Sequence, residues 1–180
     1  MENIRELLVH ELRDMLHAEQ QLVKALPKMA EATTSAELRQ AFEGHLLETE
    51  QHVNRLEQVF ERLGETAKAK KCDGIAGIIK ESEKLAHKDG TGSVMDAGLV
   101  CSAQKVEHYE IAAYGCLCTW AGLLGEEEAK SLLQQNLTEE KAADQKLTRI
   151  AETSINAKAQ RSNANEEQRG VRSPAEPVAP

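Results

Sequence analysis

The segment Q-K-V-E-H-Y-E-I-A-A-Y, residues 104–114, places a carboxylate where a helix should be apolar. It lies in a long stretch without proline in which apolar residues recur at steps of three and four, as on one face of a helix. Glu110 occupies the middle of that apolar face, so its side chain is expected to point into the protein core. Burying a lone carboxylate costs several kcal/mol, and Glu110 therefore needs a compensating partner.

The remainder of the chain favours an all-α fold. Alanine, leucine, glutamate, glutamine and lysine are abundant, and these residues are strong helix formers. Proline is confined to Pro27, Pro174, Pro177 and Pro180, so nearly the whole body of the chain lacks helix breakers. No alternating β-branched segment bounded by turns is present. The length of 180 residues fits one domain of ordinary size.

Four long helices are predicted from apolar periodicity and from the residues that start or stop a helix. They are expected at about residues 3–32, 36–63, 94–124 and 126–155, with a further short helix over 75–85. Ser35 and Ser93 are the expected N-caps, whereas Gly64 and Gly125 are the expected stops. The sequence Asp89-Gly90-Thr91-Gly92 is a strong helix breaker before the third long helix.

The lengths of the links predict the topology. Short links join the first long helix to the second and the third to the fourth, so each pair is expected to form an antiparallel hairpin. The long connection of residues 64–93 can cross the full length of a bundle. Hairpin, long crossover and hairpin together give a ferritin-like four-helix bundle, whereas an up-down-up-down bundle would not need the crossover.

The C-terminal part of the chain differs in composition from the rest. From Ala157 onward the sequence is polar, contains three prolines and has almost no large apolar residue. This composition predicts a helical domain over residues 1–156 and a disordered tail over residues 157–180.

Every long helix carries an acid on or near its apolar face. On a helical wheel, Glu19, Glu110 and Glu140 lie near the centres of their stripes, and Glu48 lies toward one edge. The candidate metal ligands are therefore Glu19, Glu48, His52, Glu107, Glu110, Glu140 and Asp144. His45 is also central on its stripe but, taken alone, is better explained as a hydrogen-bonded core histidine, and Glu139 lies off the face. The sequence leaves open whether these two residues contribute.

The two halves of the chain echo each other in these acids. H-A-E at residues 17–19 resembles H-Y-E at residues 108–110, and E-x-x-x-H at residues 48–52 is matched by E-x-x-x-D at residues 140–144. The step from the first acid to the second is 29 residues in one half, Glu19 to Glu48, and 30 in the other, Glu110 to Glu140. This repetition predicts a pseudo-twofold site built from two helical hairpins.

The electrostatic cost of burying these carboxylates favours bound metal ions at that site. Converging carboxylates repel one another, and a domain with a total stability of about 5–15 kcal/mol cannot carry them uncompensated. The core faces contain no lysine or arginine, so two divalent metal ions or protonation are the remaining compensations. Oxygen and imidazole ligands suit two iron or manganese ions. The usual di-iron pattern has histidine three residues after the acid, whereas here Glu48 is followed by His52 at the fourth position and Glu140 by Asp144.

Composition also bears on partners and location. A net charge of −8 makes a nucleic-acid partner unexpected. No apolar run of about 18 residues is present, so no membrane helix is expected. The N-terminus lacks a signal-peptide core, and the four cysteines are interpreted as free buried thiols, which together predict a cytoplasmic protein. No C-x-x-C pair is present for a rubredoxin-type iron module.

Several segments resemble the YciF/YciE family of ferritin-like bacterial proteins. They are D-M-L-H-A-E-Q-Q-L-V-K-A-L-P-K-M-A (14–30), H-L-L-E-T-E-Q-H-V-N-R-L-E-Q-V-F (45–60), K-K-C-D (70–73), Q-K-V-E-H-Y-E-I-A-A-Y-G (104–115) and E-E-K-A-A-D-Q-K-L (139–147). The resemblance implies a ferritin-like bundle with a short fifth helix, a homodimer, a di-metal centre and a link to stress response. It implies that Glu19, Glu48, Glu110 and Glu140 form the carboxylate set.

Three functions remain open from the sequence. The first is a di-metal protein that reacts with peroxide or dioxygen, or oxidises ferrous iron, during oxidative stress. The second is a stress-induced structural or interaction protein with a vestigial metal site, which the missing histidines at the third position favour. The third is a mini-ferritin cage for iron storage.

Overall fold

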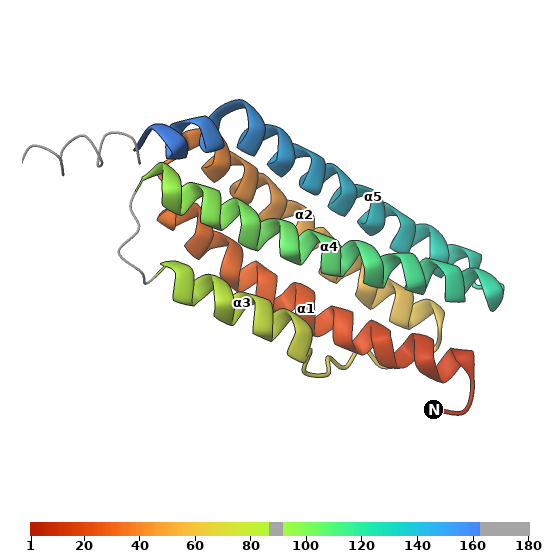
Figure 1. Ribbon diagram of the computed structural model, residues 1–180. Helices are drawn as coiled ribbons and strands as arrows, with labels where there is room; N and C mark the ends of the chain where they lie inside the picture. The colour runs from red at the N-terminus through yellow and green to blue at the C-terminus, as the bar shows by residue number, and fades with distance from the viewer. Residues whose placement is uncertain (87–91, 163–180) are drawn as a thin grey trace, which may run out of the picture.

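The computed structural model describes residues 1–86 and 92–162, and it contains helices and no strand in those ranges (Figure 1). The helices are α1 (Ile4–Ala32), α2 (Ala36–Arg62), α3 (Asp73–Ala86), α4 (Ser93–Leu123) and α5 (Glu127–Ile150), followed by a π-helical turn at Ala151–Ile155. The predicted all-α fold is confirmed. No helix of the described residues is both long enough and apolar enough to span a membrane.

The helices form two antiparallel hairpins. Helix α1 packs on α2 and α4 packs on α5, and the hairpins meet through contacts of α2 with α5 and of α1 with α4. In Figure 1, α1 and α5 run in one direction and α2 and α4 in the other. Helix α3 lies in the crossover and packs on α4 and α1. The predicted order of hairpin, crossover with a short helix, and hairpin is confirmed.

Most predicted helix ends agree with the structure to within two residues. Ser35 caps α2, because its side chain accepts a hydrogen bond from the backbone N–H of Leu38. Gly64 and Gly125, which follow α2 and α4, have φ values of 68° and 73°. This left-handed conformation favours glycine and ends each helix.

Two predicted boundaries differ from the structure. Ser93 is the first residue of α4 rather than its N-cap, because Gly92 takes the cap position with a φ of 65° and offers no side-chain hydrogen bond. Residues 157–162, which were predicted to belong to the tail, are helical. The remainder of the predicted tail, 163–180, and residues 89–91 of the predicted breaker lie outside the described residues.

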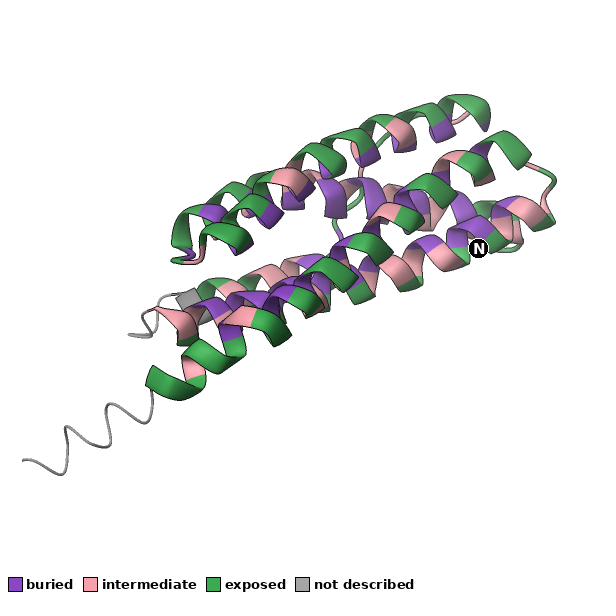
Figure 2. Cartoon of the chain, turned by 90° about the horizontal axis from the view of Figure 1, so that it is seen from above, coloured by how far each residue is buried: buried purple, intermediate pink, exposed green. Residues whose placement is uncertain are grey.

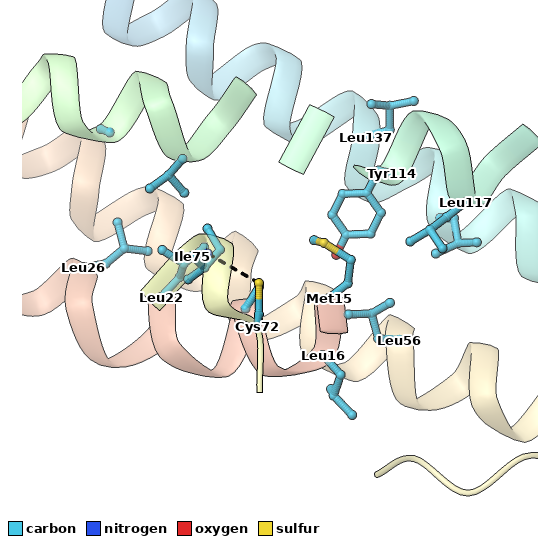
Figure 3. Close-up of a cluster of buried hydrophobic side chains, with 14 of the residues drawn as sticks. Met15, Leu16, Leu22, Leu26, Leu56, Cys72, Ile75, Tyr114, Leu117 and Leu137 are labelled. Atoms are coloured by element: carbon cyan, nitrogen blue, oxygen red, sulfur yellow. Dashed lines mark hydrogen bonds between the residues drawn. The ribbon is translucent and has the colours of Figure 1, made fainter. Parts of the chain in front are cut away.

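The core lies between the four long helices, whose buried faces point inward (Figure 2). Figure 3 shows part of it, where Met15 of α1, Leu56 of α2 and Tyr114 and Leu117 of α4 come together. These residues are almost completely buried. Their burial supplies the main stabilising free energy of the bundle.

The cysteines are free, but they are not all buried as predicted. Cys72 and Cys118 are buried, whereas Cys101 and Cys116 are exposed. The last two lie on the side of α4 that faces away from the bundle, where the apolar content of this helix extends beyond its core stripe.

A buried aspartate fastens the first hairpin to the start of α4. Asp96 Oδ1 accepts hydrogen bonds from Thr33 Oγ1 at 2.6 Å and from the Thr34 backbone N–H at 2.9 Å, and Asp96 Oδ2 accepts one from Thr34 Oγ1 at 2.7 Å. Asp96 is only 3% exposed. The turn between α1 and α2 is therefore held by a side chain from the second hairpin.

The substitution Asp96→Ala is expected to lower the free energy of unfolding by about 2–4 kcal/mol, because it leaves buried donors without an acceptor. Urea unfolding followed by circular dichroism measures this change. Glu57→Ala, at an exposed position of α2, is the control and should change stability by less than about 0.5 kcal/mol. Equal effects of the two substitutions would contradict the structural role of Asp96.

Candidate metal centre

Six buried side chains from all four long helices converge in the middle of the bundle. They are Glu19 from α1, His45 and His52 from α2, Glu107 and Glu110 from α4, and Glu140 from α5. Glu19, His52, Glu110 and Glu140 have no exposed surface. Each apolar stripe that formed its helix therefore also carries at least one acid or histidine into the core.

The six side chains form two groups that share one residue. His45, Glu107, Glu110 and Glu140 form the first group, and Glu19, His52 and Glu140 form the second. Within each group, one possible ligand atom from every residue lies within 4.8 Å of the others. The shared Glu140 places the two groups side by side, which is the arrangement that a pair of metal ions requires.

The histidine nitrogens lie closest to the acids. His45 Nε2 is 3.5 Å from Glu107 Oε1 and 3.5 Å from Glu140 Oε2. His52 Nδ1 is 2.8 Å from Glu140 Oε1 and 3.3 Å from Glu19 Oε1. At 2.8 Å, His52 Nδ1 and Glu140 Oε1 form an ion pair when the ring is protonated, but the angle at the ring nitrogen is not that of a hydrogen bond.

The atoms without partners concentrate in this cluster. Among residues 1–86 and 92–162, nine buried side-chain nitrogen or oxygen atoms lack a hydrogen bond, and eight of them belong to the six clustered residues. Both oxygens of Glu110 and both of Glu140 are in this set. Native proteins rarely leave buried polar atoms unpaired, so a cluster of eight points to a ligand that accepts their lone pairs. Carboxylate and imidazole donors fit a divalent iron or manganese ion.

Each histidine is held from outside by a second carboxylate. His45 Nδ1 is hydrogen bonded to Glu48 Oε2 at 3.1 Å, and His52 Nε2 to Glu139 Oε2 at 2.8 Å. These bonds fix the orientation of each ring and direct its other nitrogen into the cluster. Metal-binding histidines commonly show this arrangement.

A series of side-chain hydrogen bonds connects the cluster to Arg55 on the surface side of α2. Arg55 donates two hydrogen bonds to Glu139, at 2.5 and 2.9 Å, and one to Asn136 Oδ1 at 2.9 Å. Asn136 Nδ2 donates to Tyr114 Oη at 3.0 Å, and the Tyr114 hydroxyl donates to Glu19. Arg55 thus positions the partners of both His52 and Glu19.

Residues 3–160 match the family model of a domain of unknown function, DUF892. The chain belongs to the DUF892 family. It is 44% identical over 161 residues to Protein YciF of Escherichia coli K12, a match that covers 89% of this chain and 97% of that protein. The resemblance to the YciF family seen in the sequence is confirmed.

Two solved structures of DUF892-like chains agree in fold. The crystal structure of the E. coli stress protein YciF matches with a TM-score of 0.84 and 43% identity, covering 87% of this chain and 99% of that one. YcfI from Rhodopseudomonas palustris, described as a candidate structural protein, matches with a TM-score of 0.80 and 46% identity, covering 82% of this chain and 94% of that one.

The structure brings together five of the seven residues proposed as ligands for this DUF892 member: Glu19, His52, Glu107, Glu110 and Glu140. Glu48 and Asp144 lie outside both groups. Glu48 is half exposed and bonds the outer nitrogen of His45, whereas Asp144 contacts Gln104 Nε2 at 3.4 Å and His108 Nε2 at 3.5 Å. Metal binding by the five clustered residues remains a prediction.

The structure also places the two residues that the sequence left open. His45 is in the cluster, and its central position on the α2 stripe was the available signal. Glu139 bonds the outer nitrogen of His52 from a different helix. No spacing within the chain could reveal that contact, because it joins residues 87 positions apart.

Burial changes the protonation of the cluster. Desolvation raises the pKa values of Glu107, Glu110 and Glu140, and repulsion from neighbouring carboxylates adds to this rise. Burial lowers the pKa of His52, but Glu140 and Glu19 outweigh burial and raise it to about 11. The metal-free cluster therefore holds protons, which bound metal ions would displace.

The free energy of unfolding of the metal-free protein is expected to fall as pH rises from about 6 to about 9. Glu107, Glu110 and His52 all have raised pKa values, so above about pH 6.5 the folded state binds more protons than the unfolded state. The contribution of His52 is complete below its unfolded pKa of about 6.5 and is lost toward its folded pKa of about 11.

Urea unfolding in the presence of a chelator, at several pH values, measures this dependence. The variant Glu110→Gln removes one proton-binding group, so its free energy of unfolding should fall less steeply with rising pH. A free energy of unfolding that stays constant or rises across this range would contradict the proposed protonation of the cluster.

Proposed function

We propose that this protein is a di-metal carboxylate protein of the stress response that binds two iron or manganese ions. It reacts with peroxide or dioxygen, or oxidises ferrous iron. The observation that carries this proposal is the set of eight unpaired buried atoms in six converging side chains. A description of the E. coli relative as a stress protein supports the physiological setting.

The two groups divide the ligands between two ions. His45, Glu107 and Glu110 would hold one ion, and Glu19 and His52 would hold the other. Glu140 is within reach of both groups and would be shared between the ions. No lysine or arginine side chain approaches these acids within 4 Å among the described residues, so the ions would supply the missing positive charge.

Two iron ions, if bound in the divalent state, would supply the two electrons that, with two protons, are needed to reduce one hydrogen peroxide molecule to two water molecules. The chain positions the donors and connects them to solvent. His52 Nε2 is bonded to Glu139, whose side chain is 31% exposed, so protons can pass between solvent and this edge of the cluster. The buried walls keep bulk water away from the remaining acids.

Metal analysis by plasma mass spectrometry tests the proposal on protein purified without chelator or metal-affinity resin. Close to two iron or manganese ions per chain are expected. Glu110→Ala is expected to abolish stoichiometric binding, because both Glu110 oxygens face the cluster without partners. Glu57→Ala, at an exposed position, is the control and should bind as much metal as the wild type. Unchanged metal content in Glu110→Ala would refute the site.

A structural role is the second candidate, and one observation favours it. The solved relative from R. palustris is described as a candidate structural protein. In that case the raised pKa values of the buried acids, together with the two histidines, would balance the charge of the cluster without metal.

Thermal unfolding with and without chelator distinguishes these functions. A metal that binds only the folded state must raise its stability, so the di-metal protein should lose several degrees of Tm in chelator. The structural protein should keep its Tm and should contain no metal even after reconstitution. The homodimer implied by the family resemblance remains a prediction, which sizing in solution checks.

A further inference from the structure

A pocket of about 80 Å³ lies between α2 and α5 and reaches the candidate metal centre. Its walls are formed by Ala41 and Phe42 of α2 and by Ala143 and Leu147 of α5. All four side chains are apolar and buried. The walls therefore offer no hydrogen-bond partner to a charged molecule on its way inward.

The floor of this pocket belongs to the cluster. His45 and Glu107 lie there, whereas Glu48, which is half exposed and holds His45 from outside, lines the pocket nearer to solvent. By contrast, a larger surface depression of about 490 Å³ beside Pro27 and Arg39 includes none of the six clustered residues. The smaller pocket thus joins solvent to two of the proposed ligands.

Lys146 lies at the mouth of the pocket, above Gly44 of α2. A β-carbon added at Gly44 would have the Lys146 ammonium, 3.9 Å away, as its one close neighbour. Glycine inside a helix costs about 1 kcal/mol relative to alanine, and Gly44 does not have a positive φ that would require it. The position of the ammonium above Gly44 shows that the lysine side chain extends across the gap between α5 and α2.

We propose that this pocket is the entrance for a small uncharged oxidant, hydrogen peroxide or dioxygen, and that Ala143 and Lys146 determine what passes. This inference rests on the proposed di-metal function. The pocket volume is about half that of a roughly 150 Å³ cavity that binds benzene, so an aromatic hydroperoxide fits this pocket poorly. The Lys146 ammonium and the Glu48 carboxylate place opposite charges on the lining, so the entrance carries no net charge from this pair that would draw in a cation or an anion.

Narrowing the pocket tests the entrance directly. The variant Ala143→Leu is expected to bind as much metal as the wild type but to lower kcat/KM at least tenfold for hydrogen peroxide. The same fall is expected for dioxygen, measured in separate reactions. Ala112→Leu, at an exposed position of α4 away from the pocket, is the matched control and should leave both rates unchanged. A wild-type rate in Ala143→Leu with both oxidants would overturn the inference.

Widening the mouth is the second test, and it uses an exposed residue whose loss should not affect folding. Lys146→Ala is expected to raise the rate with cumene hydroperoxide, relative to that with hydrogen peroxide, at least threefold. Lys141→Ala, which is exposed on the same helix but does not line the pocket, is the control. An unchanged ratio in Lys146→Ala would overturn the role of this lysine.

Xenon binding provides a measurement that requires neither metal nor turnover. Crystals under xenon pressure should hold xenon between Phe42, Ala143 and Leu147 in the wild type and none in Ala143→Leu. If xenon does not bind in the wild-type pocket, the inference that this pocket is the entrance is overturned, even if the protein consumes peroxide. If the metal-loaded wild type consumes neither oxidant, the proposed function fails instead, so the two failures are distinguishable.

Discussion

The burial of four carboxylates between the long helices is the constraint on which the rest of this structure depends. Glu19, Glu107, Glu110 and Glu140 leave water for an environment that disfavours their charge. Two histidines lie close to them, yet the inner nitrogen of each has no hydrogen-bond partner. The cluster is thus assembled but unsatisfied by protein groups alone, which is unusual for a native core and typical of a metal site.

The surroundings of the cluster show how the bundle keeps these groups in place. Glu48 and Glu139 hold the outer nitrogens of His45 and His52, and Arg55 holds Glu139 through two hydrogen bonds. The outer carboxylates remain partly in water, where their charge costs little, while the inner acids are dry. This division lets glutamate orient a buried histidine from the solvent side and also offer oxygen ligands inside the cluster.

The hairpin topology makes this convergence possible. Each hairpin supplies three of the six clustered residues, and the crossover through α3 returns the chain so that α4 runs parallel to α2 and α5 parallel to α1 (Figure 1). Asp96 joins the turn of the first hairpin to the start of α4. The pocket between α2 and α5 lies at the seam of the hairpins, where small alanine side chains leave room.

The helices, their turns and the acids on their apolar faces could be predicted from the sequence, because helical periodicity and capping are local properties. Glu110 and Glu140 at stripe centres were predicted to point inward, and they do. The place of His45 in the cluster, the contact of Glu139 with His52 and the position of Asp144 outside the cluster came only from the tertiary structure. Residues one turn apart differ by about 40° around a helix, so the packing of neighbouring helices determines which of them reaches the centre.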